Sequence, residues 1–129
     1  MTISDAKAFT SKWLPEWTGN QPELLASFYT EDAFYLDPFI PNGINGKKKL
    51  LRYFRKLLSA NPNWVWTNLE VIFPTANGFL NKWLAKISVG NTIVECVGVC
   101  TVHIRDGLIE RNEVFFDRSK LLNSKKEMS

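Results

Sequence analysis

The second half of the chain alternates between β-forming runs and short turn signals, and this pattern limits the fold more than any other feature of the sequence. Gly90-Asn91 and Asp106-Gly107 suit two-residue hairpin turns, because these residues tolerate the positive φ angles that such turns require. The pattern predicts four antiparallel strands that pair in order as a curved meander. The β-branched and aromatic runs that form them cover residues 64–73, 79–89, 92–104 and 108–116.

The first half of the chain has apolar residues at helical spacing, interrupted by Pro and Gly. Helices that precede an antiparallel sheet and pack on one of its faces predict an α+β fold of two layers. In order, we expect a helix from the cap Ser4 to Trp17 with a bend at Pro15, a helix over 22–29, a short strand over 34–36, a loop over 39–46 and a helix over 47–60.

The length of 129 residues fits one domain, which we place at residues 1–123, followed by a polar tail over 124–129. The first residues contain no apolar run of signal-peptide length, and no stretch approaches the length of a membrane span. We therefore expect a cytoplasmic protein with no membrane partner.

Charge argues against a nucleic-acid partner. The net charge is +3, and four basic residues against one acidic residue after position 117 already account for it, so the body of the chain is neutral. The basic residues of segment 47–56 interleave with apolar residues at helical spacing, which favours an amphipathic helix with a solvated face.

Cys96 and Cys100 would lie about 13 Å apart on one strand, too far for a disulfide. With a single His in the chain we expect no metal site.

The third predicted strand is apolar on both faces, since Val97 and Val99 alternate with Cys96, Gly98 and Cys100. An antiparallel sheet with one solvated face should alternate more cleanly between apolar and polar residues. We therefore expect a homodimer formed through the open face of the sheet.

The order of the elements resembles the NTF2-like superfamily, which includes ketosteroid isomerase, SnoaL-like polyketide cyclases and limonene epoxide hydrolase. Segment 24–38, LLASFYTEDAFYLDP, looks like the family's passage from a helix through an acidic turn to a strand that ends in Asp-Pro. Segment 106–117 resembles the SnoaL-like ending. The resemblance implies a cone in which the N-terminal helices pack on a curved four-strand meander plus a short first strand. It also implies a pocket for a small apolar or aromatic ligand, without a cofactor.

Alignment with ketosteroid isomerase places Asp37 at the position of that family's general base. The other catalytic positions differ, because Trp13 and Phe54 stand where the family has tyrosines and Thr101 stands near its protonated aspartate. The loss of two acidic donors argues against steroid isomerase activity. Thr101 and His103 also stand in place of the Arg-x-Asp pair that epoxide hydrolysis requires, which argues against that reaction.

Asp37 is the candidate catalytic residue. A carboxylate at the end of an apolar strand suits a general base if it points into the cone. The alternative is that Asp37 caps the turn before Pro38 and faces solvent. The candidate ligand-binding residues are Trp13, Trp17, Tyr29, Phe54, Trp83, Thr101, Asn112 and Phe116.

Several assignments stay open at this point. We expect most of the five tryptophans in the core, and Tyr35 as a packing residue. Glu95, Thr101 and His103 share one face of the third strand, and a one-residue slip of register decides whether that face is concave.

Two functions fit these residues. The first is a cofactor-free isomerase or cyclase of SnoaL-like type, in which Asp37 acts as a general base on an apolar carbonyl compound. The second is a non-catalytic module that binds a ligand or serves as a dimeric scaffold.

Overall fold

The computed structural model describes residues 1–128, and it describes the side chains of residues 1–124. The elements in chain order are α1 (Ile3–Trp13), the 3₁₀ helix η1 (Leu14–Trp17), α2 (Pro22–Ala26), β1 (Tyr29–Leu36), β2 (Ile44–Asn45), α3 (Lys47–Ala60), β3 (Val65–Ile72), β4 (Gly78–Val89), β5 (Thr92–Arg105), β6 (Leu108–Phe116) and α4 (Ser119–Met128).

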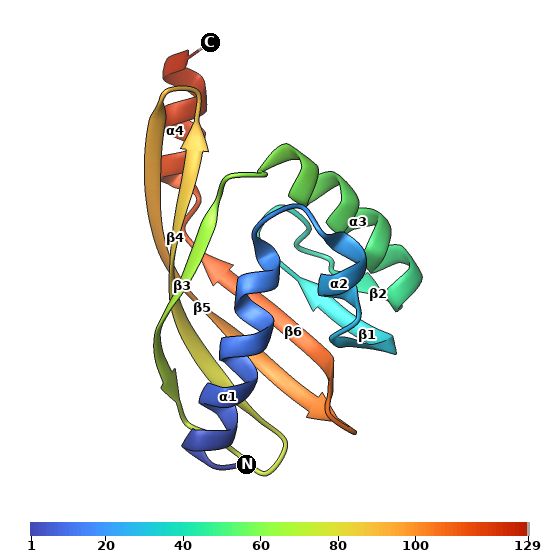
Figure 1. The fold of residues 1–129 in the computed structure, drawn as a ribbon. Coiled ribbons are helices and arrows are strands. Elements are labelled where there is room, and N and C mark those ends of the chain that lie inside the picture. Colours follow the sequence, from blue (N-terminus) through green and yellow to red (C-terminus); the bar gives the residue numbers. More distant parts are fainter. Residues whose placement is uncertain (129) are drawn as a thin grey trace.

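The strands form one sheet in the order β2-β1-β6-β5-β4-β3. Strands β3 to β6 pair antiparallel in chain order, which confirms the predicted meander. Strand β1 continues the sheet by pairing parallel with β6. The sheet is strongly curved, and α1, α2 and α3 lie on its concave side (Figure 1). The chain therefore has the α+β cone that the resemblance implied.

The structure places the side chain of Thr101 in β5 outside the cone, although the sequence predicted it as a ligand-binding residue. Val94, Cys96, Cys100 and Val102 are buried on the concave face. Because successive side chains of a strand point to opposite faces, Thr101 lies on the convex face. A period of two identifies the two faces of a strand but not which one is inside, and both faces of β5 are apolar.

The N-terminal elements begin and end at residues other than those expected. Helix α1 is capped by Thr2 rather than Ser4, since the Thr2 hydroxyl accepts a hydrogen bond from the Asp5 N–H at 3.0 Å. Helix α2 ends at Ala26 instead of Tyr29, because Tyr29 is already paired with Ile109 of β6 as the first residue of β1. Tertiary pairing thus overrides the local helical pattern.

Helix α4 packs against β4 and β5 through Leu121, which is buried. The helix runs from Ser119 to Met128, so it passes through position 123, at which we expected the domain to end. The boundary of the domain stays a prediction. Among residues 1–128, no helix is long and apolar enough to cross a membrane.

Candidate functional site

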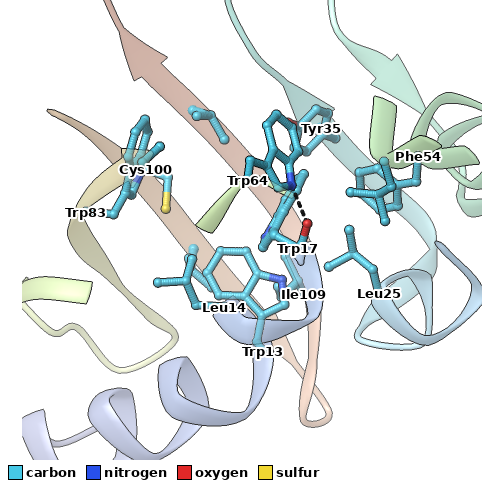
Figure 2. Packing of buried hydrophobic residues seen from close by; sticks show 14 of the residues in the cluster. Trp13, Leu14, Trp17, Leu25, Tyr35, Phe54, Trp64, Trp83, Cys100 and Ile109 are labelled. Atoms are coloured by element: carbon cyan, nitrogen blue, oxygen red, sulfur yellow. Dashed lines mark hydrogen bonds between the residues drawn. The ribbon is translucent and has the colours of Figure 1, made fainter. Parts of the chain in front are cut away.

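A cavity of about 330 Å³ lies between the helices and the concave face of the sheet. All five tryptophans of the chain line it, and their rings converge from α1, η1, β3 and β4. Figure 2 shows four of them, together with Tyr35 of β1 and Cys100 of β5. Among residues 1–124, the wall consists of Trp13, Leu14, Trp17, Tyr35, Asp37, Phe39, Tyr53, Lys56, Leu57, Ala60, Asn61, Trp64, Trp66, Trp83, Ile87, Cys100, Val114, Phe116 and Leu121.

Some of the aromatic rings of the wall meet at steep angles. Trp64 and Trp66 are perpendicular with ring centroids 5.2 Å apart, and Trp66 and Trp83 meet at 62° and 4.4 Å. The Trp64 indole N–H donates a hydrogen bond to the backbone carbonyl of Trp17, which joins the residue before β3 to η1 (Figure 2). Four of the five tryptophans belong to the buried core, as expected from the sequence, and their rings also line the cavity.

Asp37 is the acidic residue of the wall, and only 3% of its surface is exposed. Its Oδ2 accepts hydrogen bonds from the Tyr35 hydroxyl at 2.9 Å and from the Tyr53 hydroxyl at 2.7 Å. Its Oδ1 accepts a third bond from the backbone N–H of Phe39 at 2.8 Å. Asp37 therefore caps the turn at Pro38, but it does not face solvent. It is buried at the cavity, as its candidate role as a general base requires.

Both tyrosines are held in their neutral form. Burial raises the pKa of the Tyr35 hydroxyl, and the negative charge of Asp37 raises it further. Burial also raises the pKa of Tyr53, together with its hydrogen bond to Asp37. The two hydroxyls are therefore donors, and the carboxylate is their common acceptor. On another part of the wall, burial raises the pKa of the Cys100 thiol to about 12, so this thiol is neutral at physiological pH.

Five of the nine residues selected from the sequence lie on the cavity wall: Asp37, Trp13, Trp17, Trp83 and Phe116. The structure brings these side chains together from α1, η1, the end of β1, β4 and β6.

Three further residues from the sequence prediction are fully buried but lie behind the wall. The Tyr29 hydroxyl donates to Asn112 Oδ1 at 2.9 Å, and the Asn112 amide donates to the Thr101 carbonyl at 2.9 Å. Phe54 packs against Trp17 with ring centroids 5.2 Å apart. These residues support the rings that line the cavity.

The fourth residue, Thr101, does not lie on the wall, because its side chain is on the convex face of β5. Its hydroxyl accepts a hydrogen bond from the Glu113 N–H at 3.2 Å. His103 and Glu95 are on the same convex face and are exposed. Neither side chain therefore faces the cavity opposite Asp37.

The sequence analysis missed the two tyrosines that contact Asp37, although a signal for Tyr53 was present. Tyr53, Leu57 and Ala60 are spaced four and three residues apart on α3, so they form one helical stripe beside the buried stripe of Leu50 and Phe54. Tyr35 was expected only to pack, whereas its hydroxyl donates a hydrogen bond to Asp37 Oδ2. The turn at Pro38 brings the two side chains together.

Among residues 1–124, no group of three or more His, Cys, Asp and Glu side chains is placed to hold a metal ion. Lys56 is the other charged residue of the wall, and its exposed side chain puts it at the rim of the cavity. The chemistry that the side chains offer is thus one carboxylate, two hydroxyls and a large aromatic surface.

Over residues 11–112 the chain matches the family model described as SnoaL-like domain. The chain belongs to the SnoaL-like domain family. No curated protein sequence matches it.

Several solved structures share the fold of this SnoaL-like protein. A hypothetical protein with a ketosteroid isomerase-like fold from Catenulispora acidiphila, in complex with trimethylamine, has a TM-score of 0.80 at 15% identity, with 92% of each chain covered. A candidate SnoaL-like polyketide cyclase from Jannaschia sp. CCS1 has a TM-score of 0.79 at 11% identity, covering 96% of this chain and 94% of its own. A SnoaL-like protein of unknown function from Burkholderia thailandensis has a TM-score of 0.75 at 14% identity, covering 91% and 98%. At these identities the likeness establishes the fold alone.

Proposed function

We propose that this SnoaL-like protein binds a small apolar carbonyl compound in the aromatic cavity and that Asp37 moves a proton on it without a cofactor. The observation that carries the proposal is the burial of the Asp37 carboxylate in a wall that is otherwise mostly aromatic and aliphatic. A carboxylate in such a place can take a proton from the carbon beside a carbonyl and return it at another atom. The cavity volume of about 330 Å³ is at the lower end for ligand sites, which favours a small substrate.

Proton removal beside a carbonyl puts negative charge on the carbonyl oxygen, which needs a hydrogen-bond donor. The indole N–H groups of Trp13 and Trp66 have no partner among the described residues, although both rings line the cavity. Buried donors without partners are uncommon in native proteins. We infer that a ligand oxygen can use one of them after a small movement of the ring.

The proposal can be tested before a substrate is known. The protein is incubated in D₂O with a panel of small cyclic ketones, and deuterium incorporation at the carbon beside the carbonyl is followed by NMR. We expect the wild-type protein to accelerate exchange for at least one ketone, and Asp37→Asn to lower that rate by about 100-fold or more, the usual effect of a general base. The matched control is Glu95→Gln, which removes an exposed carboxylate on the convex face and should leave the rate unchanged. Equal rates in wild type and Asp37→Asn would contradict the role of Asp37.

A second candidate function is ligand binding without catalysis. It is favoured by the three hydrogen bonds that Asp37 already accepts, because they engage both oxygens of its carboxylate. The complex of the Catenulispora acidiphila protein with trimethylamine supports a cavity for small organic molecules in this fold. Saturable binding of a compound that is never turned over or exchanged would select this function.

We also propose that the protein forms a homodimer through the convex face of the sheet. Ile93, Val97 and Phe115 are exposed there by 65%, 53% and 48%. Apolar residues gathered on an open sheet face are typical of an interface with a second copy. A cytoplasmic location stays a prediction from the sequence.

A further inference from the structure

We propose that the cavity selects small organic cations, of the substituted-ammonium class, over neutral molecules of the same shape. The inference rests on the cavity being the ligand site of the proposed function, and it does not depend on proton transfer there. It narrows the ligands of the proposed function from small carbonyl compounds in general to those that carry an ammonium group.

The negative charge of Asp37 favours a cationic ligand. Its three hydrogen-bond donors are neutral, since they are two hydroxyls and one backbone N–H. Among residues 1–124, no Lys, Arg or His side chain forms an ion pair with it. A buried carboxylate without a cationic partner is costly, and a cation that enters the cavity would supply the missing charge.

The aromatic wall of the cavity also favours a cationic ligand. The face of an aromatic ring carries partial negative charge, and walls built of several such rings bind quaternary ammonium groups. Here Trp64, Trp66 and Trp83 all line the cavity, and their rings contact one another at 62° to 90°, so their faces point in different directions. At the rim, the guanidinium carbon of Arg118 already lies 5.5 Å from the centroid of the Phe39 ring, which is itself part of the wall.

The Asp37 carboxylate and the aromatic wall favour the same kind of ligand. The carboxylate and the ring faces both favour positive charge inside the cavity, whereas Lys56 is exposed at the rim, where water screens its charge. A cationic group would also assist the proposed proton transfer. A positive charge close to the carbonyl stabilises the negative charge that develops there, and the two tyrosine hydroxyls of the wall already donate to Asp37.

Choline and 3,3-dimethylbutan-1-ol test the inference, because they have nearly the same shape and differ in the charge of the branched head. Both are titrated at constant ionic strength, and binding is followed by intrinsic fluorescence, since all five tryptophans line the cavity. We expect choline to bind about tenfold more tightly or better, the preference that a desolvated cation–π contact supplies. Asp37→Asn should reduce that preference severalfold, and Glu95→Gln should leave it unchanged.

The possible results of the two experiments bear on cation selectivity and on proton transfer as follows. Equal binding of the two compounds, or tighter binding of the alcohol, would overturn cation selectivity while leaving the cavity as the site for neutral carbonyl compounds. A preference for choline that Asp37→Asn does not reduce would overturn the role given to the carboxylate. Binding of neither compound and of no ketone would refute both proposals. Selective binding of choline without ketone exchange would support the cation site and contradict proton transfer.

Discussion

Replacing Asp37 by asparagine should leave the free energy of unfolding close to that of the wild-type protein, whereas replacing it by alanine should lower that free energy substantially. Asparagine keeps the shape of the side chain and can still satisfy its neighbours. Its oxygen can accept from the Phe39 N–H while its amide group donates to the oxygens of Tyr35 and Tyr53, or the amide can be turned the other way with the loss of one bond.

The magnitude follows from two opposing terms. Each hydrogen bond to Asp37 weakens by about 1 kcal/mol when its charge is removed, which amounts to about 3 kcal/mol for the three bonds. The same substitution removes the cost of burying a carboxylate without a cation, which is several kcal/mol. The two terms nearly cancel, so we expect a change within about 2 kcal/mol of zero. Alanine removes the same burial cost, but it also leaves the Phe39 N–H and the buried Tyr35 hydroxyl without an acceptor, at about 1–3 kcal/mol each, so we expect the alanine variant to be roughly 2–6 kcal/mol less stable than the asparagine variant.

Urea and thermal unfolding at pH 7, followed by far-ultraviolet circular dichroism, measure both variants. For a chain of this size we expect the alanine variant to lose about 10 °C or more in Tm, and the asparagine variant to change by a few degrees in either direction. An asparagine variant as unstable as the alanine variant would refute the reasoning. It would mean that the charge of Asp37 itself holds the structure together, and that its place at the cavity needs no function to explain it.

Three further predictions follow from the same packing. Gly98→Ala should destabilise the protein by about 1–3 kcal/mol in thermal unfolding, because the added Cβ would lie 2.6 Å from the Trp83 ring and 2.6 Å from a backbone oxygen of the neighbouring strand; a Tm equal to that of the wild type would contradict this packing. The Cys100 thiol should not react with a bulky disulfide reagent at pH 8 in the native protein and should react in denaturant, because it is buried and burial raises its pKa to about 12. Labelling of the native protein at Cys100, detected by mass spectrometry of the peptide, would contradict this prediction. Val97→Lys should convert a dimer to a monomer in analytical ultracentrifugation with little change in the unfolding transition, and an unchanged sedimentation coefficient would exclude this face as the interface.

Local sequence patterns were sufficient where short-range interactions decide the structure. Strand β6 has the predicted bounds, and helix α3 begins and ends where its amphipathic periodicity indicated. The hairpin turns also lie where predicted, because Gly90, Asp106 and Gly107 adopt the positive φ angles that these turns need. Asp37 was selected from its place at the end of an apolar run together with the resemblance to ketosteroid isomerase.

The tertiary structure decided what depends on contacts between distant residues. The parallel pairing of β1 with β6 extended a three-residue run into an eight-residue strand and shortened the preceding helix. The concave face of β5 was decided by the helices that cover it, because alternation alone does not distinguish two apolar faces. The Asp37 carboxylate receives its second hydroxyl from Tyr53, which is 16 residues away in the chain.

The sequence by itself determined the order of the elements, the α+β class and the position of one carboxylate at a strand end, because backbone preferences and hydrophobic periodicity are local properties. Only the tertiary structure showed that all five tryptophans surround one cavity and that two tyrosines hold the carboxylate at its wall. Tryptophan and tyrosine are amphipathic, and their spacing in the sequence is the same whether they fill a core or line a cavity. That choice depends on how much space remains when a curved sheet and three helices close over each other.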